Sequence, residues 1–303
     1  MLKEGMLFLA KQDSIREFAE SNPLAQRVAR RFVAGESLDA AMQATHALNK
    51  RHISVSVDHL GENTTDEREA SAAANDYVGI IERIHQEGAD ANISVKLTAL
   101  GLDISDQICR DNLTRVLRRA GEYGIFVRVD MEASEYTQRT VDLVAELHHT
   151  FDNVGTVMQS ALYRTPDDVD RLLHERVRMR LVKGAYLEPS TVAYAHKADV
   201  DSAYMRLLWP LLERGVYPAF ATHDERMIDA VIRIARERDI PRARFEFQML
   251  YGIRRDLQER LAAAGYNVRV YLPYGSQWYP YLTRRMAERP ANLMFVLGNT
   301  FRG

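Results

Sequence analysis

The stretch ISVKLTALGLDISDQICRDNLTRVLRRAGEYGIFVRVDM, residues 93–131, contains two short runs rich in β-branched residues, separated by a longer amphipathic segment. The runs 93–97 and 125–131 are typical of strands, and DNLTRVLRRAGEYG between them is typical of a helix. A strand, a helix and a second strand in this order predict a βαβ unit whose two strands pair in parallel.

The same pattern recurs along the chain, with strand-like runs that begin roughly 24 to 40 residues apart, each followed by an amphipathic stretch. Alternating strands and helices predict a parallel sheet with helices outside it. The eight runs lie at residues 53–57, 93–97, 125–131, 154–159, 178–184, 218–222, 244–249 and 268–273.

Eight βα units are compatible with a closed barrel or with a large open sheet. A (β/α)₈ barrel needs about 250 residues, which residues 51–303 supply. An open doubly wound sheet is expected to carry a glycine-rich phosphate turn, and no such motif follows any of the runs. We therefore predict a TIM-type (β/α)₈ barrel over 51–303, with residues 1–50 as an N-terminal helical arm.

Composition narrows the class of protein. Hydrophobic residues make up 46% and charged residues 27%, as in soluble globular enzymes, and the net charge of −2 gives no sign of a nucleic-acid partner. The single cysteine, Cys109, excludes a disulfide framework and favours the reducing cytoplasm.

No apolar run is long enough for a transmembrane helix. Peripheral contact with the inner face of the cytoplasmic membrane stays open. No metal-binding or serine-nucleophile motif occurs.

Polar residues stand where most of the predicted strands end. In (β/α)₈ enzymes, the reactive groups lie at the carboxyl ends of the strands. Each side chain alone also has an ordinary interpretation, as an ion-pair partner, a loop hydrogen bond or a lysine reaching solvent. Arg180 differs, because burying an arginine within a strand is costly without a fixed partner. Together they predict one site: Lys96, Asp130, Glu132, Gln159, Arg180, Lys183, Gly184, Tyr186, Thr222, His223, Gln248, Tyr271 and Tyr274.

Two adjacent arginines, Arg284 and Arg285, follow the last predicted strand in YLTRRMAERP, residues 281–290. A solvated helix with local ion pairs would account for them. However, both precede Glu288, the less favourable order for pairs within a helix. Aromatic residues are dense just before them, so the segment also fits a pocket that holds a carboxylate beside a flat apolar ring.

Seven segments together resemble the proline dehydrogenase family, in the right order from about residue 50 to the C-terminus. They are SVKLTALG, VRVDMEAS, MQSALYRT, RLVKGAY, FATHD, FQMLYG and YLPYGSQWYPYLTRRMAERP. The resemblance implies a (β/α)₈ barrel that binds FAD non-covalently and oxidises L-proline to Δ¹-pyrroline-5-carboxylate. Hydride passes from proline C5 to FAD N5, and electrons pass on to a membrane quinone. A second dehydrogenase domain is not recognised, so the chain resembles the monofunctional form, whose product goes to a separate pyrroline-5-carboxylate dehydrogenase.

The resemblance also assigns residues. Asp130 and Arg180 are expected to be catalytic, and Asp130 to lie beside both proline and flavin. Leu187 stands where the family often has an aromatic residue near the adenine of FAD. The substrate positions are Lys96, Asp130, Tyr186, Leu250, Tyr271, Tyr281, Arg284, Arg285 and Glu288. The flavin positions are Gln159, Arg180, Lys183, Gly184, Ala185, Thr222, His223 and Gln248.

Three other functions remain open from the residues. A Schiff-base lyase on the same barrel would use Lys96 or Lys183 as its nucleophile. A non-catalytic barrel could bind an amino acid as a sensor. A different flavin barrel, such as a folate reductase, would oxidise NADH. A bound flavin and its response to proline would separate these functions.

Overall fold

The computed structural model describes residues 22, 26 and 29–288, with side chains up to Thr283. Eight strands close into a barrel in chain order, and every neighbouring pair is parallel, including β1 with β8. The predicted (β/α)₈ fold is confirmed and the open sheet is wrong. The strands are β1 Ser54–His59, β2 Ala91–Val95, β3 Val127–Val129, β4 Val154–Gln159, β5 Arg178–Val182, β6 Ala219–Ala221, β7 Glu246–Leu250 and β8 Asn267–Tyr274.

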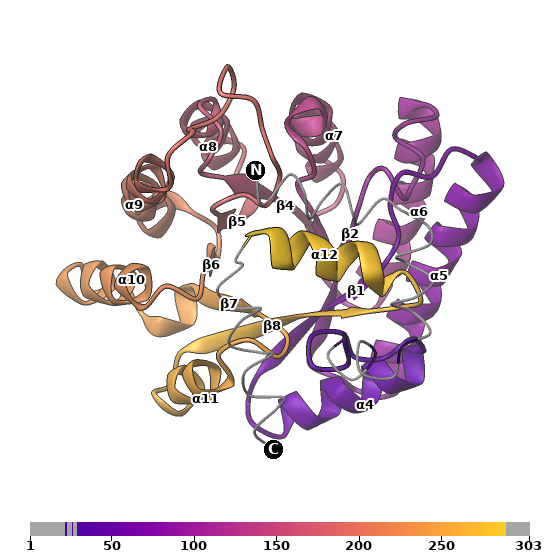
Figure 1. The fold of residues 1–303 in the computed structure, drawn as a ribbon, viewed down its shortest axis with the longest axis horizontal. Helices are drawn as coiled ribbons and strands as arrows, with labels where there is room; N and C mark the ends of the chain where they lie inside the picture. Colours follow the sequence, from indigo (N-terminus) through magenta and orange to yellow (C-terminus); the bar gives the residue numbers. More distant parts are fainter. Residues whose placement is uncertain (1–21, 23–25, 27–28, 289–303) are drawn as a thin grey trace.

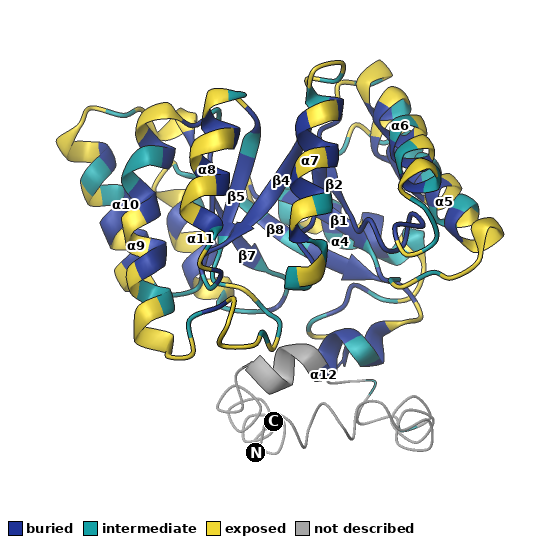
Figure 2. Cartoon of the chain, turned by 90° about the horizontal axis from the view of Figure 1, so that it is seen from above, coloured by how far each residue is buried: buried dark blue, intermediate teal, exposed yellow. Residues whose placement is uncertain are grey.

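Helices surround this barrel (Figure 1). Their buried sides face the strands and their exposed sides face outward (Figure 2). Several begin at a side chain that accepts hydrogen bonds from the first turn, as Asp66, Ser105 and Asp224 do. The α-helices are α4 Leu38–Asn49, α5 Glu67–Gln86, α6 Asp106–Glu122, α7 Thr137–His148, α8 Thr165–His174, α9 Lys197–Arg214, α10 Glu225–Glu237, α11 Arg255–Ala263 and α12 Trp278–Glu288, and two short 3₁₀ helices are η1 Ser134–Tyr136 and η2 Arg242–Arg244.

Each predicted run overlaps a strand, but most of the ends differ. β4 has the predicted bounds, whereas β2 ends at Val95, so Lys96 lies just beyond it. β1 is longer than predicted because its pairing with β8 continues to His59. That extension brings Asp58 into the strand.

The inside of the barrel is polar. Valines and isoleucines on alternate strand positions pack against the helices, as Val55, Val57 and Ile93 do. The positions between them face inward, where Ser56 and Ser94 contact one another at 3.3 Å. Barrel interiors are usually filled by branched apolar side chains. This one buries charged groups instead, and each of them needs a partner.

The helix α12 lies across the carboxyl end of the barrel (Figures 1 and 2). Its first turns pack in a small apolar cluster with Ala29, Val33 and Leu60. The last helix of the arm, α4, packs on the outside of the barrel against β1 and β8. The division of the chain at residue 50 stays a prediction. No helix in the described part of the chain combines the length and apolar character that crossing a membrane requires.

Candidate functional site

A hydrogen-bonded network from five strands lies at the carboxyl end of the barrel interior. Lys96 Nζ donates to Asp58 Oδ1 at 2.8 Å and lies 3.9 Å from Asp130 Oδ2. Arg180 Nη1 donates to Asp130 Oδ1 at 2.9 Å. Tyr271 OH donates to Asp130 Oδ2 at 2.7 Å. The structure thus brings together Lys96, Asp130, Arg180 and Tyr271, four of the residues that the sequence analysis assigned to one site.

The two carboxylates and two cations of this network balance in charge. Asp58 is 0% exposed and Arg180 only 5%. Burial raises the pKa of Asp58 and opposes the charge on Lys96, but attraction to Asp58 and Asp130 raises the pKa of Lys96 overall. Burial and then Asp130 raise the pKa of Tyr271 well above its usual value, so its phenol stays protonated and donates.

Sequence reasoning missed Asp58. The predicted strand stopped at residue 57, one position before it. The signal was the alternation of Ser54, Ser56 and Asp58, since positions two apart on a strand face the same side. It also missed Ser94, whose hydroxyl contacts Arg180 Nη2 at 3.2 Å.

The two predicted glutamines are held by groups that only accept hydrogen bonds. Gln159 Nε2 donates to the Glu132 carbonyl oxygen at 2.9 Å. Gln248 Nε2 donates to the buried carboxylate of Glu246. An acceptor can bind only the amide nitrogen, so each partner fixes which end of its glutamine is the oxygen. The amide oxygens of both glutamines are therefore directed away from these partners.

Gly184 lies against one of these oxygens. Its φ of 116° is a conformation that residues with a side chain rarely adopt. A Cβ here would lie 3.1 Å from Gln159 Oε1 and 3.2 Å from the Ala161 Cβ. The loop after β5 therefore needs glycine at this position to approach the end of β4.

The remaining predicted flavin positions follow β5 and β6. Lys183 Nζ pairs with Asp201 Oδ1 at 2.7 Å and lies 3.5 Å from Asp224 Oδ2. Thr222 Oγ1 accepts from the Asp224 backbone N–H at 3.1 Å. His223 Nε2 accepts from the Leu250 N–H at 3.0 Å, which requires the ring tautomer protonated at Nδ1. These contacts tie the loops after β5, β6 and β7 together.

The other predicted positions lie at the mouth. Ala185, Tyr186 and Leu250 are partly exposed on the loops after β5 and at the end of β7. Tyr281 is buried in α12. Arg284, Arg285 and Glu288 belong to α12, but their side chains lie outside the described residues.

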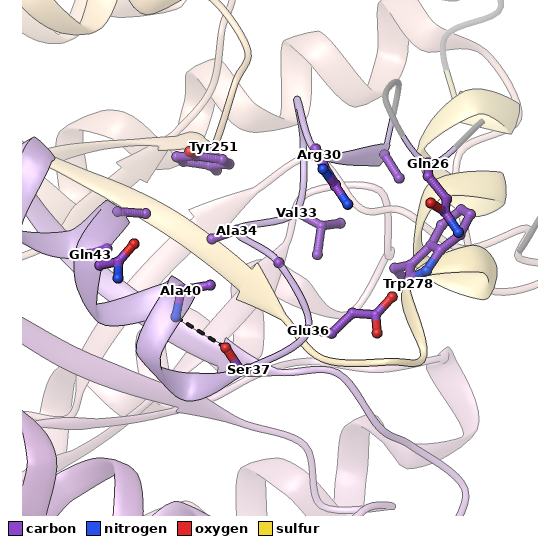
Figure 3. A pocket seen from close by; sticks show the side chains of 13 residues that line it. Gln26, Arg30, Val33, Ala34, Glu36, Ser37, Ala40, Gln43, Tyr251 and Trp278 are labelled. Atoms are coloured by element: carbon purple, nitrogen blue, oxygen red, sulfur yellow. Dashed lines mark hydrogen bonds between the residues drawn. The ribbon is translucent and has the colours of Figure 1, made fainter. Parts of the chain in front are cut away.

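A cavity of about 830 Å³ lies beside the first turn of α12, next to the arm. Figure 3 shows Arg30, Glu36 and Trp278 among the side chains around it. None of the residues predicted for proline or flavin lines it. This cavity is therefore separate from the network at the strand ends.

The buried pair of Asp58 and Lys96 predicts a large effect on stability. We expect Asp58→Ala to lower the free energy of unfolding by about 3–5 kcal/mol, because Lys96 would stay buried without its nearest carboxylate. Urea denaturation followed by circular dichroism measures this. As a control, Asp39→Ala removes one of the two carboxylates that pair with Arg83 near the surface and should cost less than about 1 kcal/mol. If Asp58→Ala lost as little unfolding free energy as Asp39→Ala, the buried charge of Lys96 would not depend on Asp58.

Comparison with known proteins places this chain in a family. The proline dehydrogenase family model matches residues 41–297. Proline dehydrogenase of Deinococcus radiodurans is 42% identical, with 100% of this chain and 99% of that protein aligned. Proline dehydrogenase 1 of Bacillus subtilis is 38% identical, with 98% of each chain aligned.

Solved structures agree. Proline utilization A from Bdellovibrio bacteriovorus, in a crystal structure of the protein inactivated by N-propargylglycine, superposes with a TM-score of 0.83 at 30% identity. The match covers 91% of this chain and 34% of that one, so this chain spans about a third of that longer protein. By sequence over nearly its whole length and by fold, the chain belongs to the proline dehydrogenase family.

Proposed function

We propose that the chain oxidises L-proline to Δ¹-pyrroline-5-carboxylate, with a non-covalently bound FAD as the electron acceptor. The observation that carries this proposal is the buried, charge-balanced network beneath α12, which is formed by Asp58, Lys96, Asp130, Arg180 and Tyr271. A membrane quinone as the next acceptor, a separate pyrroline-5-carboxylate dehydrogenase for the product, and a cytoplasmic location with peripheral membrane contact belong to the same proposal.

The residues at the ends of β4 to β7 fit a flavin. Arg180 Nε is buried and has no hydrogen-bond partner among the described residues. Gly184 leaves free the space that a Cβ would take beside Gln159. The amide oxygens of Gln159 and Gln248 can accept from a ligand donor, such as a ring N–H. The residues that would hold FAD are Gln159, Arg180, Lys183, Gly184, Ala185, Thr222, His223 and Gln248.

When bound, a flavin supplies the two-electron acceptor. The chain supplies position and charge. Asp130 holds the Arg180 guanidinium and the Tyr271 hydroxyl in fixed places. The fixed guanidinium of Arg180 stabilises negative charge that develops during the reaction. The Tyr271 side chain restricts the space around the proline ring, and Arg284 and Arg285 bind the substrate carboxylate.

The lyase alternative is disfavoured by the lysines themselves. A Schiff-base lysine must lose its proton at working pH. Attraction to Asp58 and Asp130 raises the pKa of Lys96, despite its burial. Lys183 is paired with Asp201. Family membership likewise favours a dehydrogenase over an amino-acid sensor or a folate reductase.

The proposal predicts a yellow protein that releases its colour on denaturation. Acid precipitation should leave a colourless pellet and FAD in the supernatant, because the chain holds the cofactor only by non-covalent contacts. Absorption spectra and chromatography of the supernatant measure this. A pellet that stays yellow, or a native protein without flavin absorption, would contradict the proposal.

Arg180 is expected to act on the flavin more than on proline. Arg180→Met should lower the flavin reduction potential or the FAD content, because a positive charge that favours the reduced form is lost. In the fraction that retains FAD, affinity for a proline analogue should change less. Arg180→Lys, which keeps the charge, should restore part of the potential. Normal flavin properties with weakened analogue binding would falsify this assignment.

Arg284 and Arg285 are expected to bind the proline carboxylate. Arg284→Ala and Arg285→Ala should each weaken proline binding by about ten- to a hundredfold, and lysine should rescue only partly because the bidentate fork is lost. Glu288→Ala should have a smaller effect. Pyrrolidine, which lacks the carboxylate, is the control ligand. If proline and pyrrolidine lose affinity equally, the arginines do not bind the carboxylate.

A further inference from the structure

The amino-terminal half of the barrel interior holds a second group of charged residues, separate from the network at the carboxyl end. Arg269 pairs with Glu246, with its Nε 3.2 and 3.1 Å from the two carboxylate oxygens. Arg269 Nη1 also donates to the Val55 carbonyl oxygen at 2.9 Å. The same carboxylate accepts from Gln248. Glu246 is therefore already shared between Arg269 and Gln248.

Two further guanidinium groups lie in this half, attracted by Glu246 but with no described carboxylate within ion-pair distance. Arg128 is 1% exposed, and its Nη1 donates only to the carbonyl oxygens of Thr156 and Arg178, at 2.9 and 2.8 Å. The Nε atoms of both Arg128 and Arg178 are buried and have no hydrogen-bond partner in the described part of the chain. Neither arginine forms an ion pair with any described residue.

Aromatic rings lie against the Arg178 guanidinium. Its Cζ is 4.2 Å from the centre of the Phe126 ring and 4.9 Å from that of Tyr217. Arg128 also lies over Phe126, at 4.7 Å. Ring faces attract a cation but cannot accept its N–H groups as an anion does. Burial lowers the pKa of both arginines, and attraction to Glu246 offsets this only in part, so keeping them charged here has a cost.

The backbone makes room for these two arginines. Gly155 lies between them in the sheet, paired with Arg128 on β3 and with Arg178 on β5. A Cβ on Gly155 would lie 2.3 Å from the Arg178 carbonyl oxygen and 3.1 Å from Arg128 Nη1. Because the Phe126 ring would also lie 2.8 Å away, glycine at this position is required by the Arg178 backbone and the Phe126 ring as well as by the Arg128 side chain.

A cavity of about 720 Å³ lies at the amino-terminal face, next to this region, although neither Arg128 nor Arg178 is among its lining residues. Tyr217, which packs on Arg178, is part of its wall. Its basic side chains include the exposed Arg176 and Arg244, whereas Glu213 is its only carboxylate among the described residues. The charge of the cavity therefore has the same sign as that of Arg128 and Arg178 and would attract an anion.

We propose that this end of the barrel binds a small oxyanion of the phosphate type, with Arg178 as its main ligand and Arg128 beside it. Buried charges in proteins are normally paired, and here the chain itself supplies no pair. A guanidinium donates two parallel hydrogen bonds that match the oxygens of an oxyanion better than a spherical ion. The site lies at the opposite end of the strands from the proposed proline site.

Thermal unfolding of the protein as purified tests this. Inorganic phosphate is titrated in a buffer of low anion content, against sodium chloride at equal ionic strength. Wild type should gain about 3–6 °C at saturating phosphate beyond the gain in chloride. Arg178→Met should lose this excess. Without phosphate it should unfold no earlier than wild type, because a partly buried charge without an ion-pair partner has been removed.

The matched control is Arg233→Met, which removes an exposed arginine on α10 and should keep the full phosphate effect. Equal gains in wild type and Arg178→Met would show only the general stabilisation by phosphate salts and would overturn the proposal. Equal gains in phosphate and chloride would also overturn it. Should Arg178→Met not fold, Arg178→Lys takes its place. It keeps the charge but not the fork, and an undiminished phosphate effect would count against the site.

Discussion

The carboxylate of Asp130 is the interaction on which the site depends. It accepts from Arg180 and Tyr271 at once, and Lys96 lies 3.9 Å from it. Without Asp58 and Asp130, two cations would be buried in the barrel with no negative charge near them. The polar interior is thus possible only because closure of the barrel brings side chains from β1, β3 and β5 to one end.

Hydrogen bonds from residues next to the site fix the orientation of its two glutamines. Glu246, paired with Arg269, fixes the amide of Gln248 two residues further along β7. The Glu132 carbonyl oxygen, which follows β3, likewise fixes the amide of Gln159 at the end of β4. Both glutamines are therefore oriented by the protein before any ligand binds. A site supported in this way on strands keeps its geometry better than one built on loops.

The sequence predicted the parts of this arrangement that depend on local pattern. β-branched runs located all eight strands, and β4 to the residue, because strand propensity and helix amphipathicity are local properties. Asp58 was missed because the extent of β1 is set by pairing with β8, more than 200 residues away. Arg128 and Arg178 were not singled out, because a strand pattern does not show which polar positions lack a partner. That depends on side chains from other strands.

Charge balance distinguishes the two ends of the barrel. At the carboxyl end, Lys96 and Arg180 are matched by Asp58 and Asp130, so this network has little net charge left to attract a substrate carboxylate. A carboxylate bound there needs cations from another element, and α12, which crosses this end, carries Arg284 and Arg285 in its sequence. The network can then fix the position of the ring while the helix binds the charge. At the amino end, no described carboxylate lies within ion-pair distance of Arg128 or Arg178, so an anionic ligand there would complete the charge balance that the carboxyl end achieves by itself.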